Sequence, residues 1–377
     1  MNFVFFITIY AIFANLIFAT PTGTVIEKLS GPHSLYFYPN VQGKRILLLG
    51  DQHTQGDTCL KKNPGTNVSE VQNWIMELAD TSPECLDVFV ETDYRSSNAA
   101  RNLKVRESCG DLRSCSSPLS AVVSAFAPCI KDNSDCSQNL RYHYIDVRYI
   151  KGLIKDIEGK NHFATDQLVD CFARITRNNT EVYDKVENEL GKINMGSVSL
   201  YRLGIRRDSK DRKEFNSFSR FLCKVSKNIC DEKICDETYL NNYNKMVWKI
   251  LAKEIEKLTL DGNKFITTLY SLYEYKFEHI LMTTMDVYFI ARLFSKFDLA
   301  KMERSPVGCR NHRYGEIKNA VIYAGAGHID IYNRFIQKYF DLKPSISISP
   351  EGKNQCMIFD RPFDYFKQNE ESHSESL

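Results

Sequence analysis

The sequence predicts an α/β protein in which a mixed, largely parallel central sheet is flanked by helices and carries a large helical insertion. Two segments of one design support this fold class: the apolar runs at 45–49 and 320–324 each lead directly into Gly-x-x-His. Short apolar runs that stop at a glycine are typical of buried strands in parallel sheets. The run at 86–91 supplies a third such strand, whereas residues from about 150 to 305 show mainly helical periodicity. We therefore expect these three strands to be parallel neighbours.

The length and composition of the chain suit one large globular domain. Its 377 residues are 43% hydrophobic, which allows a sizeable core, and we assign residues 21–367 to a single α/β domain. The net charge of +2 gives no reason to expect a nucleic-acid partner. The polar segment 368–377 is predicted to be a disordered tail.

The N-terminal segment is predicted to be a secretory signal peptide, residues 1–20. Residues 3–19 carry no charged side chain, and small Ala19 precedes a Thr-Pro-Thr-Gly stretch that ends the apolar run. The alternative is an uncleaved membrane anchor formed by residues 3–19, because the segment lacks a positively charged start. The protein is therefore expected to be secreted or lumenal, and to contact a membrane only if the segment is retained.

The cysteines agree with an exported protein. There are twelve, an even number, and none forms Cys-x-x-Cys, so disulfides are favoured over a zinc ribbon. Three local pairs are available: Cys109 with Cys115, Cys129 with Cys136, and Cys230 with Cys235. Asn67 and Asn178 begin Asn-x-Ser/Thr triplets, which predicts a glycoprotein.

The N-terminal part of the domain reads as a hairpin followed by a helix. Residues 34–38 are aromatic and strand-like, residues 39–43 supply a turn, and residues 44–49 form the next strand. Apolar residues at helical spacing then predict a helix at 68–79.

The middle of the chain begins with a fourth strand candidate at 141–148. Apolar side chains at helical spacing form a stripe over 246–258, which ends at Asp261-Gly262. Residues 264–297 contain no Gly or Pro and predict one long helix or two stacked helices.

The C-terminal part is predicted to contain one helix and one hairpin. The helix is expected at 331–340. Residues 345–349 alternate strictly between polar and apolar, residues 355–359 form another strand candidate, and the segment between them reads as the turn of a hairpin.

Chemically useful side chains stand where the predicted strands end. They are His53 with Asp51, Glu91, His328 with Asp330, and Asp146 with Arg148. Because open α/β sheets bind ligands beyond the carboxyl ends of their strands, we expect His53, Glu91 and His328 to meet in one cleft. Asp51 and Asp330 are second choices. His328, which follows two glycines, is expected in a partly exposed loop.

These residues leave two chemistries open. His53, Glu91, His328 and Asp51 could bind a divalent metal ion and activate its water. Without metal, one His or Glu could act as a general base on water and another as an acid. Each histidine could also be a hydrogen-bonded structural residue. Serine-hydrolase and His-Glu-x-x-His motifs are absent from the sequence, and Asp330 replaces the third glycine of a dinucleotide fingerprint.

The paired Gly-x-x-His segments, with Glu91 on the strand between them, resemble the superfamily of Tiki and TraB-type proteins, erythromycin esterases and haem-binding ChaN lipoproteins. The resemblance covers residues 44–95 and 318–335. It implies peptide cleavage with a divalent metal, ester cleavage, or haem binding. It also implies a further acidic residue and an Arg in the helical part. The candidates for these are Glu278, His279, Asp286 and Arg292.

The sequence as a whole predicts a secreted or lumenal hydrolase that acts on a peptide, ester or small-molecule substrate. Its catalytic residues would be His53, Glu91 and His328, with a divalent metal of unknown identity as the candidate cofactor. The alternative is a non-catalytic secreted protein that binds a metal, haem or another ligand in the same cleft.

Overall fold

The computed structural model describes the sheets and the helices packed against them. The residues described are 25–53, 59, 68–95, 117–126, 137–151, 250–272, 277–297, 309, 315–349 and 355–367. The predicted signal peptide (residues 1–20), the tail (368–377) and both glycosylation asparagines, Asn67 and Asn178, lie outside these ranges. So does most of the predicted helical insertion between 152 and 249.

A six-stranded mixed sheet forms the centre of the fold, with the strand order β6-β5-β7-β3-β2-β8. Its strands are β6 (Leu140–Lys151), β5 (Leu86–Arg95), β7 (Asn319–Gly325), β3 (Lys44–Asp51), β2 (Ser34–Val41) and β8 (Ile346–Ile348). The first four are paired in parallel, and the last two pairings are antiparallel. The predicted mixed, largely parallel sheet is therefore confirmed.

The register of the three central strands sets the position of the site. In β3 and β7, Asp51 is opposite Gly325, so the two Gly-x-x-His segments leave the sheet at the same level. Strand β5 lies on the other side of β7, with Val90 opposite Tyr323. The expectation of three parallel neighbours is confirmed, and so is the hairpin of β2 and β3.

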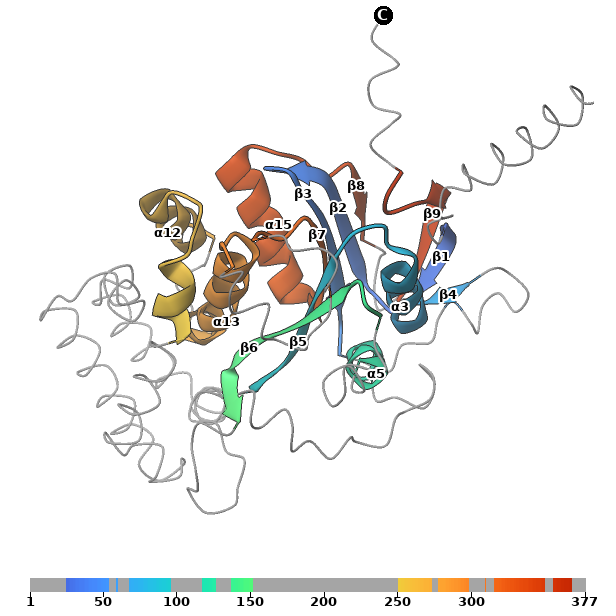
Figure 1. The fold of residues 1–377 in the computed structure, drawn as a ribbon, viewed down its shortest axis with the longest axis horizontal. Coiled ribbons are helices and arrows are strands. Elements are labelled where there is room, and N and C mark those ends of the chain that lie inside the picture. Colours follow the sequence, from blue (N-terminus) through green and yellow to red (C-terminus); the bar gives the residue numbers. More distant parts are fainter. Residues whose placement is uncertain are drawn as a thin grey trace, which may run out of the picture.

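Helices cover both faces of this sheet, as Figure 1 shows. One apolar core packs α12 (Gly262–Tyr270), α13 (Phe277–Leu293) and α15 (Ala326–Phe340) against one face. A second core packs α3 (Val71–Thr81) and α5 (Pro118–Ala125) against the other. Alternate side chains of a strand point to opposite faces, so the central strands are apolar on both sides.

A second, three-stranded sheet adjoins the second core. Its order is β4-β1-β9, with β4 (Ser69–Glu70), β1 (Ile26–Ser30) and β9 (Cys356–Phe363). The predicted C-terminal hairpin is therefore wrong: β8 pairs with β2 in the large sheet, whereas β9 pairs with β1. The alternation of polar and apolar residues at 345–349 correctly predicted a strand, but local sequence does not determine which other strand it pairs with.

The described helices fit the predicted periodicity. A helix was expected at 68–79; α3 is Val71–Thr81, and residues 69–70 form strand β4 instead. The stretch 264–297 contains two helices, α12 and α13. Asp261 caps the start of α12, because its side chain accepts a hydrogen bond from the Lys264 amide. Among the described helices, none has the length and apolar character needed to cross a membrane.

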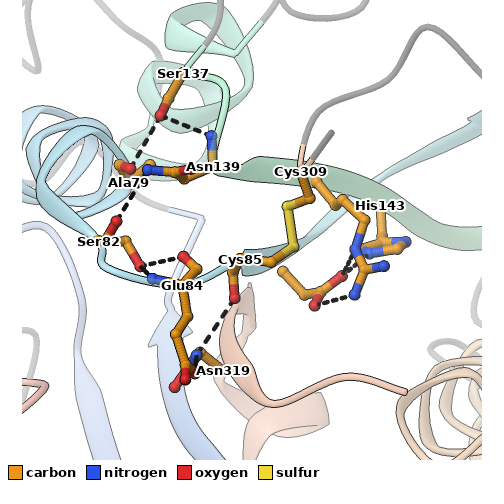
Figure 2. Close-up of a disulfide and its surroundings, with 11 residues drawn as sticks. Ala79, Ser82, Glu84, Cys85, Ser137, Asn139, His143, Cys309 and Asn319 are labelled. Atoms are coloured by element: carbon orange, nitrogen blue, oxygen red, sulfur yellow. Dashed lines mark hydrogen bonds and ion pairs between the residues drawn. A yellow bond between two sulfur atoms is a disulfide. The ribbon is translucent and has the colours of Figure 1, made fainter. Parts of the chain in front are cut away.

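Two disulfides join distant parts of the described chain. Cys59 is bonded to Cys356, and Cys85 to Cys309 (Figure 2). The first ties the segment after His53 to β9, and the second ties the start of β5 to the segment before β7. Such bonds are typical of an extracellular or lumenal protein. The three predicted local pairs lie outside the described residues.

We expect the disulfides to be detectable by thiol counting. In denatured but unreduced protein, Cys59, Cys85, Cys309 and Cys356 should resist alkylation by iodoacetamide, because their sulfurs are already bonded. Mass spectrometry of the peptides before and after reduction measures this. Alkylation of these four cysteines before reduction would place the chain in a reducing compartment.

Candidate functional site

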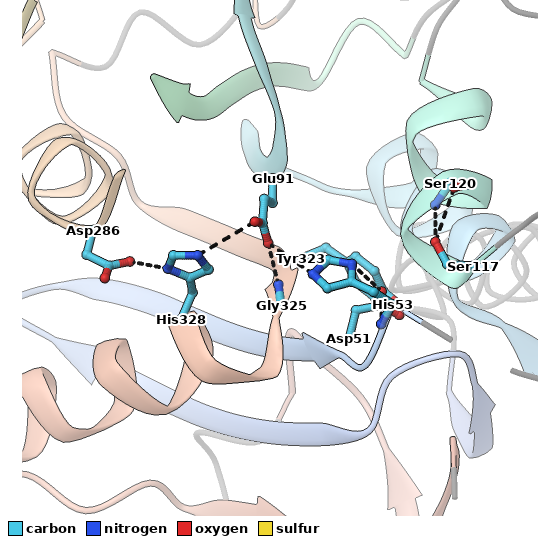
Figure 3. Close-up of polar contacts among 9 residues, drawn as sticks. All are labelled: Asp51, His53, Glu91, Ser117, Ser120, Asp286, Tyr323, Gly325 and His328. Carbon is cyan, nitrogen blue, oxygen red and sulfur yellow. Dashed lines mark hydrogen bonds and ion pairs between the residues drawn. The ribbon is translucent and has the colours of Figure 1, made fainter. Parts of the chain in front are cut away.

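The three residues expected at the strand ends do come together (Figure 3). Glu91 lies between two imidazoles: its Oε2 is 3.8 Å from His53 Nε2, and its Oε1 is 3.6 Å from His328 Nε2. The predicted convergence of His53, Glu91 and His328 is therefore confirmed. Both distances are longer than a direct hydrogen bond. Glu91 therefore interacts with the two imidazoles through charge or through a bridging water.

His53 is positioned by Asp51, the last residue of β3. The chain turns there, and His53 has a left-handed φ of 54°, which is uncommon for a residue other than glycine. Asp51 Oδ2 accepts the backbone N–H of His53 at 2.9 Å, a local turn typical of Asp, and lies 3.2 Å from His53 Nδ1. One carboxylate oxygen therefore fixes both the backbone and the ring of His53.

Tyr323 holds the other oxygen of Asp51. Its hydroxyl donates to Asp51 Oδ1 at 3.3 Å, and both side chains are buried. Burial, with the nearby Asp51 charge, raises the pKa of Tyr323, so the phenol stays protonated and remains a donor. Asp51 was predicted as a metal ligand together with the two histidines and Glu91. In the structure its Oδ2 contacts the backbone and ring of His53, and its Oδ1 accepts the Tyr323 hydroxyl.

Glu91 comes from within β5 and not from its end, because this strand continues to Arg95. Its Oε2 accepts the backbone N–H of Gly325 at 2.6 Å. Gly325 is the N-cap residue of α15, so Glu91 binds one of the free amides at the start of a helix. The helix dipole favours a negative charge at this point.

His328 is buried, contrary to the expectation of a partly exposed loop. Its side chain is only 3% exposed, because α15 begins at Ala326, directly after β7, and places His328 in its first turn. His328 Nδ1 lies 2.6 Å from Asp286 Oδ1, and the Asp286 side chain is also buried. This contact fixes the ring and directs Nε2 toward Glu91.

Asp330, a second choice from the sequence, does not join the cluster. It is about half exposed and binds Arg334 one turn further along α15. Two residues along a helix rotate the side chain by roughly 200°, so Asp330 and His328 point in nearly opposite directions.

The other candidates have different places. Arg292 binds Glu254 at 3.1 Å and lies over the Phe297 ring. Asp146 is buried on β6. The side chains of Glu278, His279 and Arg148 lie outside the described residues. Among the candidates whose side chains the structure describes, Asp286 contacts a site histidine, His328.

Asp286 and Tyr323 are the site residues whose roles the sequence did not specify. Tyr323 reads as one more apolar residue of a buried strand. Asp286 stands alone in an apolar helical stretch, Met285 to Ala291, where a carboxylate needs a partner if it is buried. A single carboxylate in this apolar stretch was the sequence feature that could have identified Asp286 as a buried residue with a polar partner.

The cluster therefore contains two carboxylate–histidine pairs, Asp51–His53 and Asp286–His328, facing one central carboxylate. The hydrogen bond with Asp51 raises the pKa of His53; partial burial opposes this rise, and the charge of Glu91 adds to it. His53 is the exposed member, with half of its side chain accessible, whereas His328 is enclosed. His53 is thus the histidine that a substrate can reach.

The donor chemistry of the cluster suits a divalent metal, because metal-binding histidines usually give their second ring nitrogen to a carboxylate. The spacing does not: among the described residues, no three His, Cys, Asp or Glu side chains are arranged to hold a metal ion.

Comparison of the chain with known protein families, with curated proteins and with solved structures found no match.

Proposed function

We propose that the protein is a secreted or lumenal hydrolase that cleaves peptide or ester bonds with His53 as its proton-transferring residue. The observation that carries the proposal is the meeting of two carboxylate-backed histidines at Glu91, at the carboxyl ends of the parallel strands β3 and β7. Ligand sites of open α/β sheets lie at this edge. Perturbed titratable groups gathered in one place favour a catalytic role.

The arrangement supports general acid–base hydrolysis. In neutral His53 the Nδ1–H donates to Asp51 Oδ2, so Nε2 carries a lone pair and can accept a proton from water. The resulting hydroxide attacks the carbonyl carbon, and the Nε2 proton then passes to the leaving oxygen or nitrogen as its bond to carbon breaks. The products are a carboxylic acid and an alcohol or amine. Glu91 and Asp51 stabilise the transient imidazolium, because both carboxylates favour the charged ring.

His328 has a different part in this proposal. It is enclosed between Asp286 and Glu91 and does not reach solvent as His53 does. Its Nε2 faces Glu91 Oε1, the oxygen that Gly325 does not bind. It therefore fixes the orientation of the central carboxylate, while His53 carries the proton.

The test is hydrolysis by the purified chain of p-nitrophenyl acetate, longer p-nitrophenyl esters and a panel of fluorogenic peptides, with and without EDTA. Cleavage that survives EDTA and is lost in His53→Ala supports the proposal. Cleavage that EDTA abolishes and one added divalent ion restores would show the metal-dependent form. Binding of zinc or haem by a chain that cleaves no member of the panel would favour the ligand-binding alternative.

Asp51→Asn should lower the rate and shift its pH dependence. Activity needs neutral His53, so the rate should rise with pH through the pKa of His53. Asp51 is the largest cause that raises this pKa, and its removal should move the acidic limb of the kcat/KM profile to lower pH. Asp330→Asn is the matched control, because its exposed carboxylate pairs with Arg334 one turn further along α15 and does not join the cluster. An unchanged acidic limb in Asp51→Asn would contradict the assignment of His53.

A further inference from the structure

His53 belongs to a segment of the chain, Gly50 to Cys59, that is fastened at both ends. At its start, the Gly50 carbonyl accepts the backbone N–H of His33 at 2.6 Å, in addition to the pairing of β3 within the sheet. At its end, Cys59 is bonded to Cys356, the first residue of β9. Five residues separate His53 from Cys59 in the sequence, so the disulfide holds the chain shortly after the site histidine.

Both ends of this segment are held by the same part of the fold, the junction of β1 and β2. Cys356 is opposite Ser30 in the pairing of β9 with β1, and the Gln355 carbonyl accepts the Gly31 N–H at 2.9 Å. His33, whose amide binds the carboxyl end of β3, follows two residues later. The disulfide therefore closes a ring that runs from β3 through the segment to β9 and back through this junction.

The junction itself is closely packed. Gly31 has a φ of 127°, in the region that favours glycine. A Cβ at this residue would lie 2.6 Å from Val71 Cγ1 in α3 and 3.5 Å from Pro118 Cβ in α5, so both helices pack against the junction. The disulfide thus fastens the His53 segment to a part of the fold that has little room to move.

His53 depends on such fastening more than His328 does. Half of the His53 side chain is accessible, whereas His328 is 3% exposed and contacts Asp286. The φ of 54° at His53 is unfavourable for a residue other than glycine, and such a conformation persists where the surrounding chain holds it. Asp51 holds the turn from the β3 side through the His53 amide. A covalent closure reduces the conformations available to the chain on the other side.

The second disulfide provides a comparison, because it lies at the opposite edge of the sheet (Figure 2). Cys85 directly precedes Leu86, which pairs with Asn319 at the start of β7. Glu91 is five residues further along β5, or about 16 Å at the usual rise of a strand. The two bonds have sequence separations of 297 and 224, and stabilisation by a cross-link depends only on the logarithm of this length. Their effects on stability should therefore be similar, whereas their distances from the site differ.

We propose that the Cys59–Cys356 disulfide positions His53 for proton transfer, in addition to stabilising the fold. The inference rests on the proposed hydrolytic function, in which His53 Nε2 must be directed first at the water and then at the leaving group. Without the bond, the turn at His53 is held from the β3 side alone, and the imidazole samples orientations that do not support the reaction. A displacement of about 1 Å can lower a catalysed rate on the order of 100-fold.

Amide hydrogen exchange tests the positioning without an activity assay. The His53 amide donates to Asp51 Oδ2, so its exchange rate, measured by NMR on the full chain, reports how firmly the turn is held. The rate should rise at least about tenfold in Cys59→Ala/Cys356→Ala, because local opening becomes easier. It should stay within about twofold of the wild type in Cys85→Ala/Cys309→Ala, the matched control. If the first pair does not fold, Cys59→Ala/Cys356→Val, which refills more of the buried space, takes its place.

The kinetic test uses p-nitrophenyl acetate at a temperature where circular dichroism shows all proteins folded. Cys59→Ala/Cys356→Ala should lower kcat at least about tenfold and keep KM within about threefold, because proton transfer is impaired and binding is not. The control pair should keep both constants within about twofold. Equal effects of the two pairs on amide exchange and on kcat would overturn the proposal, since both bonds would then act through stability alone.

The two readouts separate this inference from the hydrolytic function. If the wild type cleaves no member of the panel and yet the first pair alone accelerates exchange of the His53 amide, the hydrolytic function fails and the positioning stands. If an active wild type loses its activity in His53→Ala, but the first pair keeps the wild-type kcat and exchange rate, the positioning is wrong and the function stands.

Discussion

Replacing Glu91 with glutamine is expected to abolish hydrolysis and leave the fold intact. Glutamine keeps the size of the side chain and an oxygen for the Gly325 amide, but it removes the negative charge between His53 and His328. It also brings an amide NH₂ donor toward an imidazole, where an acceptor is needed. Loss of one preorganised group that stabilises developing charge costs roughly 100- to 1,000-fold in kcat.

Stability should respond much less than activity to this change. The Glu91 side chain is only 9% exposed, and keeping a charged carboxylate in such a site usually costs stability, so Glu91→Gln should melt at or slightly above the wild-type temperature. Glu77→Gln, on the exposed side of α3, is the matched control and should leave both rate and melting temperature unchanged. Wild-type kcat in Glu91→Gln would remove the cluster from consideration as the catalytic site.

The sequence predicted the strands of the site because their signal is local. Apolar runs that end in glycine identify β3 and β7, and the polar residues after them then follow from chain order. His328 was expected in a loop because Gly325 and Gly327 read as breaks. The structure shows that Gly325 caps α15 and that Gly327 is part of its first turn.

Contacts across long sequence separations could not be predicted in this way. Asp286 is 42 residues from His328, and helical periodicity does not say which of several polar residues will face a given histidine. The three-stranded sheet was missed for a related reason: β1, β4 and β9 are far apart in the chain, and the sequence between 349 and 356 allowed a local hairpin as readily. The partner of a strand is decided by the tertiary fold.

A second buried ionic cluster, formed by Asp87, Arg141 and His143, is expected to contribute strongly to the stability of the fold. Asp87, near the start of β5, is fully buried and binds Arg141 through two hydrogen bonds of 2.7 Å. His143 Nε2 lies 2.7 Å from the same carboxylate, and its ring stacks on Phe89. Burial alone would raise the pKa of Asp87, but Arg141 and His143 hold it below its ordinary value. The carboxylate is therefore charged at neutral pH.

Asp87→Ala should lower the free energy of unfolding by about 3–5 kcal/mol, because it leaves the buried Arg141 guanidinium without this carboxylate. Urea unfolding followed by tryptophan fluorescence at pH 7 measures the change. Asp80→Ala, at an exposed position of α3, is the control and should shift the free energy by no more than about 0.5 kcal/mol.

The pH dependence distinguishes loss of the ion pair from loss of packing. The pKa of Asp87 in the folded chain lies below its ordinary value of 3.8, so its charge stabilises the fold above that pH. This contribution is lost as the pH falls through the folded-state pKa, so the difference between wild type and Asp87→Ala should narrow in acid. A difference that stays constant from pH 7 to pH 3 would mean that Asp87 acts through its volume. A difference below about 1 kcal/mol at pH 7 would mean that Arg141 finds other partners once Asp87 is removed.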